Sequence, residues 1–581
     1  MLIPPISCAA NTNRQQSNRH ASFPVFGQEI VTRLMELGVV EIFEPGAFLF
    51  LRGARDVDMF VVVDGEIEII EKIGQMTGNT FAVLGRGQFT GELDLLDSRR
   101  TLFDCRAITR SRILRINRSM LRQIIRSEIE IADLVMQACM GRRSDIVRDA
   151  SGGVTLIGHK HSADTIRLLR FLTRNGHPYT MLDPSTNADA NSLIHSFDFQ
   201  QAHLPVVLLG DQTVLRNPST ALLSDELGLT DVSDRTTVYD VAIIGAGPAG
   251  LAAAVYAASE GLSTVVIEGN TPGGQAGTSS RIENYLGFPT GVSGQELSDR
   301  SLAQAQKFGA RFAISRDVVT MRREKNIYAL HLEDGEPVTS RTVVIATGAR
   351  YQKLNLPNYE RFEYQGIHYA ATAMEAGLCL NQEVVVVGAG NSAGQAALFL
   401  SQTSKCVHLL IRGERLETTM SNYLIQRILS SRRISLRVRS EIVRMDGEDC
   451  LQEVTWRDNA IGKIESRAIS NVFVMIGARP RTQGFCHDLA VDAKGFIMTG
   501  GAVASESLFG TNLEAVFAVG DVRSGSVKRV ASAVGEGSVV VSDIHKYLAS
   551  TKKADSAYSV PARGVVPAYM PAVMQALPQG F

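Results

Sequence analysis

The stretch at residues 238–250, VYDVAIIGAGPAG, constrains the fold of this chain more than any other part of the sequence. Residues 238–244 are mostly apolar or β-branched, which predicts a short buried strand. The glycines that follow keep the spacing G-x-G-x-x-G, and the alanine-rich run after them predicts a helix. A strand that turns into a helix through such a loop is typical of a dinucleotide-binding βαβ unit.

Each residue type in the loop at 245–250 has a physical role. Glycine permits the sharp turn, lets a pyrophosphate approach the backbone and lets the helix pack closely on the strand. The N-terminus of the helix offers unpaired N–H groups to phosphates. A second apolar run, STVVIE, ends about 20 residues later in Glu268, where an acid can bind a ribose hydroxyl. We expect the ligand contacts of this unit at Gly245, Ala246, Gly247, Pro248, Ala249, Gly250 and Glu268.

Size and charge limit what else the chain can be. With 581 residues it is long enough for several domains, and its 59 basic and 60 acidic residues leave a net charge of −1. No overall field therefore favours nucleic acid or a membrane surface as a partner. We find no uninterrupted apolar run long enough to span a bilayer, and the polar N-terminus lacks the regions of a signal peptide. We predict a cytoplasmic multidomain α/β protein in which residues 1–22 form a flexible lead.

Residues 23–150 read as β-rich runs followed by one basic amphipathic helix at 117–148. Asp64-Gly65 predicts a β-hairpin between two of these runs. The stretch at 89–93, FTGEL, is similar to the phosphate cassette of cyclic-nucleotide-binding domains, in which a β-roll precedes a helix that reports occupancy. The resemblance implies that an arginine fork matches the paired oxygens of the cyclic phosphate. The nucleotide contacts that it implies are Gly91, Glu92, Arg99 and Arg100.

This cassette departs from the family pattern in two ways. Arg99 and Arg100 come slightly early, and the bulky Leu102 and Phe103 stand where the family has small residues. Two interpretations therefore remain open, a cyclic-nucleotide sensor and a structural roll that binds no nucleotide. No helix-turn-helix pattern follows, so the sequence gives no support for DNA binding.

Residues 151–235 form a block in which a strand, a helix and two further strands follow one another. The order is similar to that of glutaredoxin and other thioredoxin-fold proteins, and Pro205 stands where that fold has its cis-proline. The resemblance implies C-x-x-C at the start of the helix, but Ser162 and Thr165 stand at the two cysteine positions. Disulfide exchange needs a thiolate, so this domain cannot perform it alone. We interpret it as a docking or spacer domain in which Ser162 or Thr165 caps the helix.

From residue 239 to about 548 the sequence resembles the low-molecular-weight thioredoxin reductases, which are flavoproteins with two dinucleotide-binding domains. The resemblance rests on PGGQ at 272–275, IENY at 282–285, ATG at 346–348 and FAVGDV at 517–522. It implies that FAD binds to the first unit, and that a helix from Lys528 stabilises negative charge on the reduced flavin. The family has Arg-Gln at the positions of Lys528 and Arg529, so this contact is altered. The further FAD contacts implied are Gly274, Gln275, Asn284, Thr347, Gly348, Asp521, Arg529 and Val530.

A second unit of the same kind lies inside the first. An apolar run at 383–387 leads into GAGNSA, which fits G-x-G-x-x-A, and a helix and another apolar run follow. That run ends in Arg412 rather than an acid, and arginine accommodates the 2′-phosphate of NADPH. The family pattern H-R-R-x-x-x-R is kept only in part, because Gly413 and Glu417 replace two arginines, although Arg415 could substitute. We expect NADPH contacts at Gly388, Gly390, Asn391, Ser392, Ala393, Arg412, Arg415 and Arg479.

These resemblances predict the domain boundaries. A cyclic-nucleotide-binding-like roll with its helix takes residues 23–150, and a thioredoxin-like domain without redox cysteines takes 151–235. An FAD domain takes 236–350 and 481–550, an NADPH domain takes 351–480, and a tail takes 551–581. Since reductases of this family are commonly homodimers, the resemblance also implies a homodimer.

The chain lacks the redox residues of the reductases it resembles. Those enzymes carry C-A-T-C just before the second dinucleotide strand, whereas Ala370 and Ala373 stand at the two cysteine positions here. None of the seven cysteines has C-x-x-C or zinc-ligand spacing, and Cys379 lies in an apolar context that favours a core residue. We therefore expect NADPH to reduce the flavin by hydride transfer, with no metal and no catalytic side chain in that step.

Four interpretations of the electron acceptor remain. The first is an FAD-dependent NADPH oxidoreductase that reduces oxygen, a quinone or another small oxidant. The second is a ferredoxin–NADP or flavodoxin–NADP reductase-like enzyme, with aromatic residues of the tail (Tyr558, Tyr569, Phe581) over the flavin. The third is a non-enzymatic nucleotide or redox sensor, and the fourth is an atypical thioredoxin reductase that reduces a redoxin directly from flavin. We favour the first, with hinges near 348–353 and 477–480 and regulation by the N-terminal roll.

Overall fold

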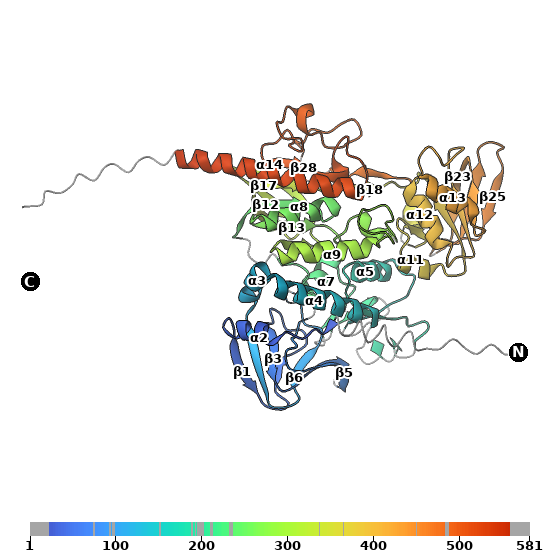
Figure 1. The fold of residues 1–581 in the computed structure, drawn as a ribbon. Helices are drawn as coiled ribbons and strands as arrows, with labels where there is room; N and C mark the ends of the chain where they lie inside the picture. The colour runs from blue at the N-terminus through green and yellow to red at the C-terminus, as the bar shows by residue number, and fades with distance from the viewer. Residues whose placement is uncertain are drawn as a thin grey trace, which may run out of the picture.

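A computed structural model describes residues 22–557 and shows several folded units along one chain (Figure 1). The gaps within this range are residues 74–75, 92–94, 96–98, 150–152, 188–189, 192, 195–202, 210–212, 232–235, 280, 336, 364, 449 and 483–486. A β-rich unit forms the N-terminal end, and α/β units with parallel sheets follow it, which confirms the predicted multidomain α/β fold class. None of the helices in the described part of the chain is long and apolar enough to cross a membrane.

The N-terminal unit, called the roll below, consists of two antiparallel sheets with helices beside them. Its elements are α2 (Gln28–Met35), β1 (Val39–Phe43), β2 (Phe48–Phe50), β3 (Met59–Asp64), β4 (Ile67–Ile73), β5 (Met76–Leu84), β6 (Asp104–Ala107), β7 (Ser111–Ile116), α3 (Arg118–Ser127) and α4 (Ile129–Asp149). The strand orders are β1-β7-β3 and β2-β6-β4-β5. A buried apolar cluster that includes Met59, Leu114 and Ile131 joins the first sheet to the helices.

Two predictions for the roll are wrong in detail. Asp64 and Gly65 form a tight turn, with Gly65 at a φ of 91°, but β3 pairs with β7 whereas β4 pairs with β5 and β6. The turn therefore joins two sheets instead of closing a hairpin. The basic helix is in fact two helices, because Glu128 adopts an extended conformation between α3 and α4. Asn117 caps the first of them by accepting a hydrogen bond from the Met120 backbone N–H at 2.9 Å.

In its described residues, the middle unit is a four-stranded sheet with helices beside it. Its elements are β8 (Val154–Ile157), α5 (Ala163–Arg174), β9 (Tyr179–Leu182), β10 (Val206–Leu208), β11 (Val214–Arg216) and α7 (Thr220–Glu226). The strand order is β11-β10-β8-β9, with β9 parallel and β10 antiparallel to β8. As predicted, Ser162 caps α5 by accepting from the Thr165 N–H at 3.2 Å, and the bond between Leu204 and Pro205 is cis. Its assignment to the thioredoxin fold stays an interpretation.

The larger domain is built on a seven-stranded sheet. Its elements are β12 (Val238–Ile244), α8 (Pro248–Ser259), β13 (Thr264–Glu268), η2 (Ala276–Thr278), α9 (Gly294–Lys307), β14 (Arg311–Ile314), β15 (Val318–Glu324), β16 (Ile327–Leu332), β17 (Pro337–Ile345), η3 (Gly500–Val503), β28 (Val516–Ala518), η4 (Gly520–Val522) and α14 (Val530–Ala557). Strands β14, β13, β12, β17 and β28 are parallel neighbours, and α8 and α14 lie side by side (Figure 1). Helix α14 continues past residue 550, the predicted domain end. Tyr558, Tyr569 and Phe581 lie outside the described residues.

The inserted domain interrupts the larger domain, as the second glycine motif predicts. Its elements are β18 (Ala349–Tyr351), α10 (Tyr359–Phe362), β19 (Ile367–His368), α11 (Ala373–Leu378), β20 (Glu383–Val387), α12 (Asn391–Leu400), β21 (Cys406–Leu410), α13 (Asn422–Ser430), β22 (Ile434–Arg437), β23 (Ser440–Asp446), β24 (Glu453–Asp458), β25 (Ile464–Arg467), β26 (Val472–Val474) and β27 (Ala478–Pro480). A parallel sheet of order β19-β26-β20-β21-β22 forms its core, beside the antiparallel sheet β23-β24-β25. The antiparallel pair β18 and β27 carries the chain in and out of this domain.

Candidate dinucleotide sites

The first glycine loop joins β12 to α8 at the carboxyl end of the parallel sheet. Gly245 has a φ of 104°, and a Cβ there would lie 2.5 Å from the carbonyl oxygen of Ala346. A Cβ on Gly250 would lie 1.9 Å from the Gly245 carbonyl oxygen, so close packing of the helix on the loop requires glycine. Gly247 differs, because the nearest atom to an added Cβ is the Cα of Gly274 at 3.9 Å. The fold alone therefore does not require glycine at position 247, so the close approach of a pyrophosphate is the reason that the motif gives for it.

Glu268 ends β13 with its carboxylate directed at the same loop. It is 8% exposed, and its two oxygens accept from the backbone N–H groups of Ala246 at 2.7 Å and Asn270 at 2.9 Å. Burial raises the pKa of Glu268, while these hydrogen bonds and the charges of Arg174 and Arg481 lower it. Each carboxylate oxygen can accept a second hydrogen bond. The arrangement fits the ribose of a dinucleotide.

The loop at 273–275 lies against the glycine loop. The Gly273 N–H donates to the Ala246 carbonyl at 2.8 Å, and the Gln275 side chain donates to the Ala349 carbonyl at 2.6 Å. Gly274 accepts from Nη2 of Arg174, which belongs to α5 of the middle unit, at 3.0 Å. The structure thus brings Gly274, Gln275 and the glycine loop together, as a shared FAD site requires, and adds Arg174, which the sequence reasoning missed.

Other predicted FAD residues lie on segments that return to the same sheet. The Thr347 hydroxyl donates to the Arg481 carbonyl at 2.8 Å, and the Arg481 N–H donates to Gly348 at 3.2 Å. Asp521 follows β28, which pairs with β17, and burial raises the pKa of its carboxyl, opposed by Lys528. The remaining residues predicted to contact FAD are Asn284, which is exposed in a loop, and Arg529 and Val530, which lie at the start of α14. That helix begins at Val530, two residues later than the expected start at Lys528.

Glu536 of α14 is a further residue that the sequence reasoning missed. Its carboxylate accepts from the Gly520 N–H at 2.6 Å and from Nη2 of Arg523 at 2.6 Å. Glu536 therefore fixes the turn that carries Asp521. The only signal in the sequence is an acid within a helix that is otherwise apolar or small, EGSVVV, and this pattern is common on partly exposed helices.

The second glycine loop joins β20 to α12 and repeats the first. Gly388 has a φ of 144°, and its added Cβ would lie 2.3 Å from the Met475 carbonyl oxygen, whereas a Cβ on Gly390 would meet nothing within 4 Å. Asn391 accepts from the Ser421 N–H at 2.7 Å, Ser392 is exposed and Ala393 is buried.

The predicted arginines of this second site lie in two places. Arg412 and Arg415 are exposed after β21 and make no hydrogen bond or ion pair with other side chains in the described ranges. Arg479 lies on β27, opposite Arg350 of β18, and is therefore part of the crossover between the two domains. The exposed pair fits the binding of a 2′-phosphate, because neither guanidinium is engaged by a carboxylate.

The segment at 369–373 lies directly beside the loop at 273–279. Ala371 forms a parallel β-bridge with Ser279, Tyr369 stacks on Tyr351 with ring centroids 5.4 Å apart, and the Tyr351 hydroxyl lies 3.0 Å from that of Thr278. Ala370 directly precedes the bridge residue and Ala373 follows it by two positions, so the segment that carries them packs against the chain that continues from Gln275.

Cys379 has the environment of a core residue. Its side chain is fully buried, and its sulfur donates to the Glu375 carbonyl at 3.1 Å. Burial raises the pKa of the Cys379 thiol to about 11. The group is therefore protonated near neutral pH and is a poor nucleophile.

The residues predicted to bind a cyclic nucleotide contact other parts of the protein. Gly91 accepts from Arg142, a buried residue of α4, and Glu92 lies outside the described residues. Arg99 donates to the Asn175 carbonyl of the middle unit at 3.5 Å, and Arg100 forms an ion pair with Glu226 of α7 at 2.8 Å. The cavity beside Arg100 measures about 40 Å³, room for a few water molecules. It is lined by Arg52, Gly53, Arg100, Thr101, Leu102, Val154, His177, Leu209, Glu226 and Leu227.

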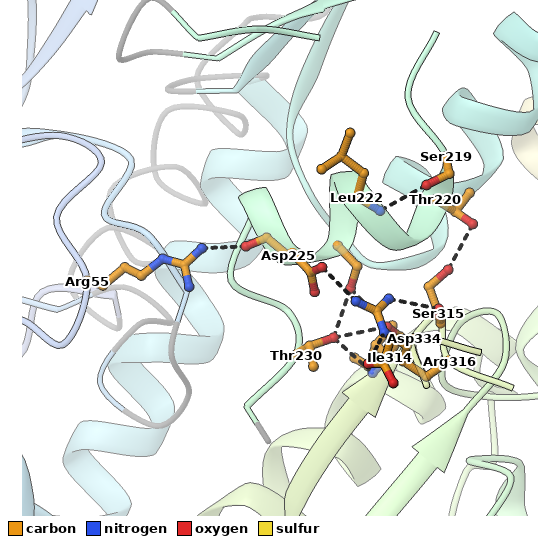
Figure 2. Close-up of polar contacts among 11 residues, drawn as sticks. Arg55, Ser219, Thr220, Leu222, Asp225, Thr230, Ile314, Ser315, Arg316 and Asp334 are labelled. Atoms are coloured by element: carbon orange, nitrogen blue, oxygen red, sulfur yellow. Dashed lines mark hydrogen bonds and ion pairs between the residues drawn. The ribbon is translucent and has the colours of Figure 1, made fainter. Parts of the chain in front are cut away.

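Helix α7 connects the roll to the larger domain (Figure 2). Arg55 of the roll donates to the Asp225 carbonyl, and the Asp225 carboxylate pairs with Nη2 of Arg316 at 2.6 Å. Arg316 is 6% exposed, and its Nε also pairs with Asp334 at 3.2 Å. The Arg316 N–H donates to the Glu268 carbonyl at 3.0 Å. A continuous path of polar contacts thus runs from the roll through α7 to Glu268.

Comparison with known proteins gives two family matches. Residues 239–537 match the family model for pyridine nucleotide-disulphide oxidoreductases, and residues 40–128 match that for cyclic nucleotide-binding domains. Thioredoxin reductase of Streptomyces clavuligerus is 34% identical over 314 residues, which cover 54% of this chain and 95% of that protein. The Mycolicibacterium smegmatis thioredoxin reductase is 32% identical over 318 residues, 55% of this chain and 99% of the relative. The crystal structure of Lactococcus lactis thioredoxin reductase (FR conformation) aligns with a TM-score of 0.50 and 30% identity, over 54% of this chain and 99% of that one.

Proposed function

The chain belongs to the pyridine nucleotide-disulphide oxidoreductase family, and from this premise we propose that it is an FAD-dependent NADPH oxidoreductase whose acceptor is not a disulfide. The family is one of oxidoreductases that use FAD and NADPH. We propose residues 236–350 and 481–550, together with the rest of α14, as the FAD domain, and residues 351–480 as the NADPH domain. We propose the roll at 23–150 and the middle unit at 151–235 as separate domains.

One observation carries the choice of acceptor. The segment at 369–373 lies beside the loop at 273–279, and the two positions that correspond to the family's cysteines are Ala370 and Ala373. Alanine accepts no electrons and forms no mixed disulfide. Cys379 does not replace the missing thiols, because it is buried and its pKa is raised to about 11. With FAD bound, the flavin itself would therefore be the group that passes electrons on, to oxygen, a quinone, a ferredoxin or another carrier.

The chain's own residues bind and orient the cofactors in this proposal. The loop at 245–250 would hold the pyrophosphate of FAD at the N-terminus of α8, and Glu268 would accept a hydrogen bond from its ribose. Gly388, Gly390 and the start of α12 hold NADPH in the same way, while Arg412 and Arg415 bind its 2′-phosphate. FAD, when bound, supplies the hydride acceptor and the onward electron carrier. The protein supplies orientation, for which no acid or base side chain is needed.

Anaerobic reduction of the purified protein tests this function. We expect bound FAD to lose its visible absorbance when NADPH is added, and to regain it when oxygen, a quinone or ferredoxin is admitted. Thioredoxin disulfide should reoxidise the flavin no faster than buffer does, in the wild type and in Cys379→Ser alike. Rapid reoxidation by thioredoxin in both would instead support an atypical thioredoxin reductase, and absence of turnover with bound FAD would support a sensor.

We also propose that the roll regulates the flavoprotein half through α7. The ion pair between Arg100 and Glu226 and the contact between Arg55 and Asp225 support this, because Asp225 also holds Arg316 beside Glu268. A ligand that draws Arg100 into the roll would release Glu226 and shift α7.

NADPH oxidation should then change when cyclic AMP or cyclic GMP is added, at saturating or subsaturating NADPH. The change should be lost in Glu226→Gln but kept in the control Glu68→Gln, whose partner Arg106 lies within the roll. Equal rates with and without nucleotide would refute regulation by these ligands.

A further inference from the structure

Helix α5 of the middle unit contacts both dinucleotide-binding domains with two arginines one turn apart. Arg170 and Arg174 have the i, i+4 spacing that places side chains on the same face of a helix. Arg174 donates to the Gly274 carbonyl of the larger domain at 3.0 Å. Arg170 donates to Nδ1 of His368 at 3.1 Å, and its Nε lies 3.3 Å from the Glu375 carboxylate, both in the inserted domain. One face of one short helix thus connects two domains that have separate cores.

The contact made by Arg174 reaches the loop that covers the first glycine motif. A Cβ on Gly274 would lie 3.0 Å from the Cα of Gly247, so the two backbones are in close contact and a shift of one would move the other. The end of α5 is held on the other side as well, because the Gln295 side chain of α9 donates to the Arg174 carbonyl at 2.9 Å. Burial lowers the pKa of the Arg174 guanidinium, and the charges of Tyr351 and Glu268 oppose this. A partly buried cation is therefore fixed at the loop.

The contacts made by Arg170 lie at both ends of the segment at 369–373. Glu375, which follows the segment, is 3% exposed and also accepts from the Thr372 N–H at 3.1 Å. His368, which precedes it, is 1% exposed. Because its Nδ1 accepts from Arg170, Nε2 carries the proton and donates to Oδ1 of Asn471 at 2.8 Å. Arg170 therefore ties the two flanks of the segment to one guanidinium.

We propose that the middle unit is a brace built into the flavin site, in which Arg174 positions the loop at 273–275 and Arg170 positions the segment at 369–373. The brace rests on the proposed function, since it takes 273–275 as a flavin-contacting loop. Both arginines are positioning residues, because they act through the backbone and through other side chains. A unit with Ser162 and Thr165 in place of redox cysteines thereby gains a role that needs no sulfur. Its helix is directed at the two segments on which a reductase of this family depends.

The test compares Arg174→Ala, Arg174→Lys and Arg170→Ala with a matched control, Arg167→Ala, all in the full-length chain. Arg167 lies on the same helix but makes its hydrogen bonds within the middle unit, to Asp164, Asn217 and the Pro218 carbonyl. Hydrogen exchange followed by mass spectrometry, with and without FAD, reports the mobility of each segment. Titration with FAD, followed by flavin fluorescence, reports its affinity.

We expect Arg174→Ala to speed exchange at 273–279 and to weaken FAD binding about tenfold or more, the usual effect of losing a hydrogen bond from a charged group. Arg174→Lys should restore part of both. Arg170→Ala should speed exchange at 368–376 and leave FAD affinity unchanged, and Arg167→Ala should change neither. If Arg174→Ala speeds exchange throughout the chain, Arg174→Lys carries the test by the same criteria.

The brace would be overturned if residues 273–279 exchanged hydrogen at the wild-type rate in the Arg174 variants. It would also be overturned if Arg167→Ala speeded this exchange and weakened FAD binding to the same extent. The outcome is separate from that of the proposed function, because exchange requires no turnover. A chain that binds FAD and never oxidises NADPH would fail as an oxidoreductase, yet would still show the segment-specific exchange that the brace predicts.

Discussion

Replacing Gly247 with alanine separates the binding role of the first glycine loop from its role in folding. Gly247 has φ −71° and ψ −179°, a conformation open to alanine, and the nearest atom to its added Cβ is 3.9 Å away. Alanine is a poorer N-cap than glycine by about 0.5 kcal/mol, but it restricts the unfolded chain by a similar amount. We therefore expect almost no change in the free energy of unfolding of the FAD-free protein.

In the FAD complex the same methyl group would occupy space that the pyrophosphate needs. Overpacking by one methyl group costs about 1–3 kcal/mol. At 1.4 kcal/mol for each factor of ten, the Kd for FAD should rise about 5- to 150-fold. Flavin fluorescence during titration of the FAD-free protein measures the Kd, and urea unfolding of the same preparation measures stability.

Gly250→Ala is the matched control, because its Cβ would lie 1.9 Å from the Gly245 carbonyl oxygen. This variant should lose about 1–3 kcal/mol of stability before any ligand is added. The reasoning is refuted if Gly247→Ala binds FAD as tightly as the wild type, or if Gly250→Ala unfolds at the wild-type urea concentration.

Three further predictions concern other residues. Arg412→Ala should raise the KM for NADPH about tenfold and leave that for NADH unchanged, because only NADPH carries a 2′-phosphate for the arginine to bind; steady-state kinetics with both nucleotides checks this. Cys379 should resist iodoacetamide at about pH 8, since burial raises its pKa to about 11, and peptide mass spectrometry would reveal any labelling that contradicts this. His177 and His368 have pKa values lowered to about 3 and about 4, first by burial and then by neighbouring arginines. Their neutral forms stabilise the fold above pH 6.5, the ordinary pKa, so the free energy of unfolding should fall as the pH drops from 6.5 towards 4, by up to about 3 kcal/mol for each. A flat pH profile of urea unfolding, or one unchanged in His368→Gln, would contradict this.

The glycine motifs predicted most of the flavoprotein half because their function demands a local geometry. A strand, a sharp turn and a helix must follow one another within a few residues, so spacing alone identifies them. The strand predicted at 383–387 matches β20, and an added Cβ at Gly247 or Gly390 would meet no protein atom closer than 3.9 Å, as a phosphate-binding loop requires. The cap at Ser162 could be found for the same reason, since its partner lies three residues away.

Contacts between distant segments could not be predicted in this way. Arg174 binds a backbone carbonyl 100 residues away, and a carbonyl leaves no trace in the sequence because every residue has one. The spacing from the cassette selects Arg99 and Arg100 as phosphate ligands, but spacing does not indicate that they contact Asn175 and Glu226 of the middle unit. The β-hairpin predicted at Asp64-Gly65 is wrong for a similar reason. A turn signal predicts a local bend, but it does not determine which strands pair on either side of that bend.

The pairing of strands β18 and β27 has a consequence for the design of chimeric proteins. Ala349 faces Pro480 across an antiparallel ladder, so the chain leaves the larger domain and re-enters it at neighbouring points, about 5 Å apart. An insert whose two ends meet in this way can be replaced as a unit, because the length of chain between the two ends does not change the geometry of the sheet that carries them. Residues 352–477 could thus be exchanged for the corresponding stretch of a relative with a different nucleotide preference, with the junctions kept in the ladder.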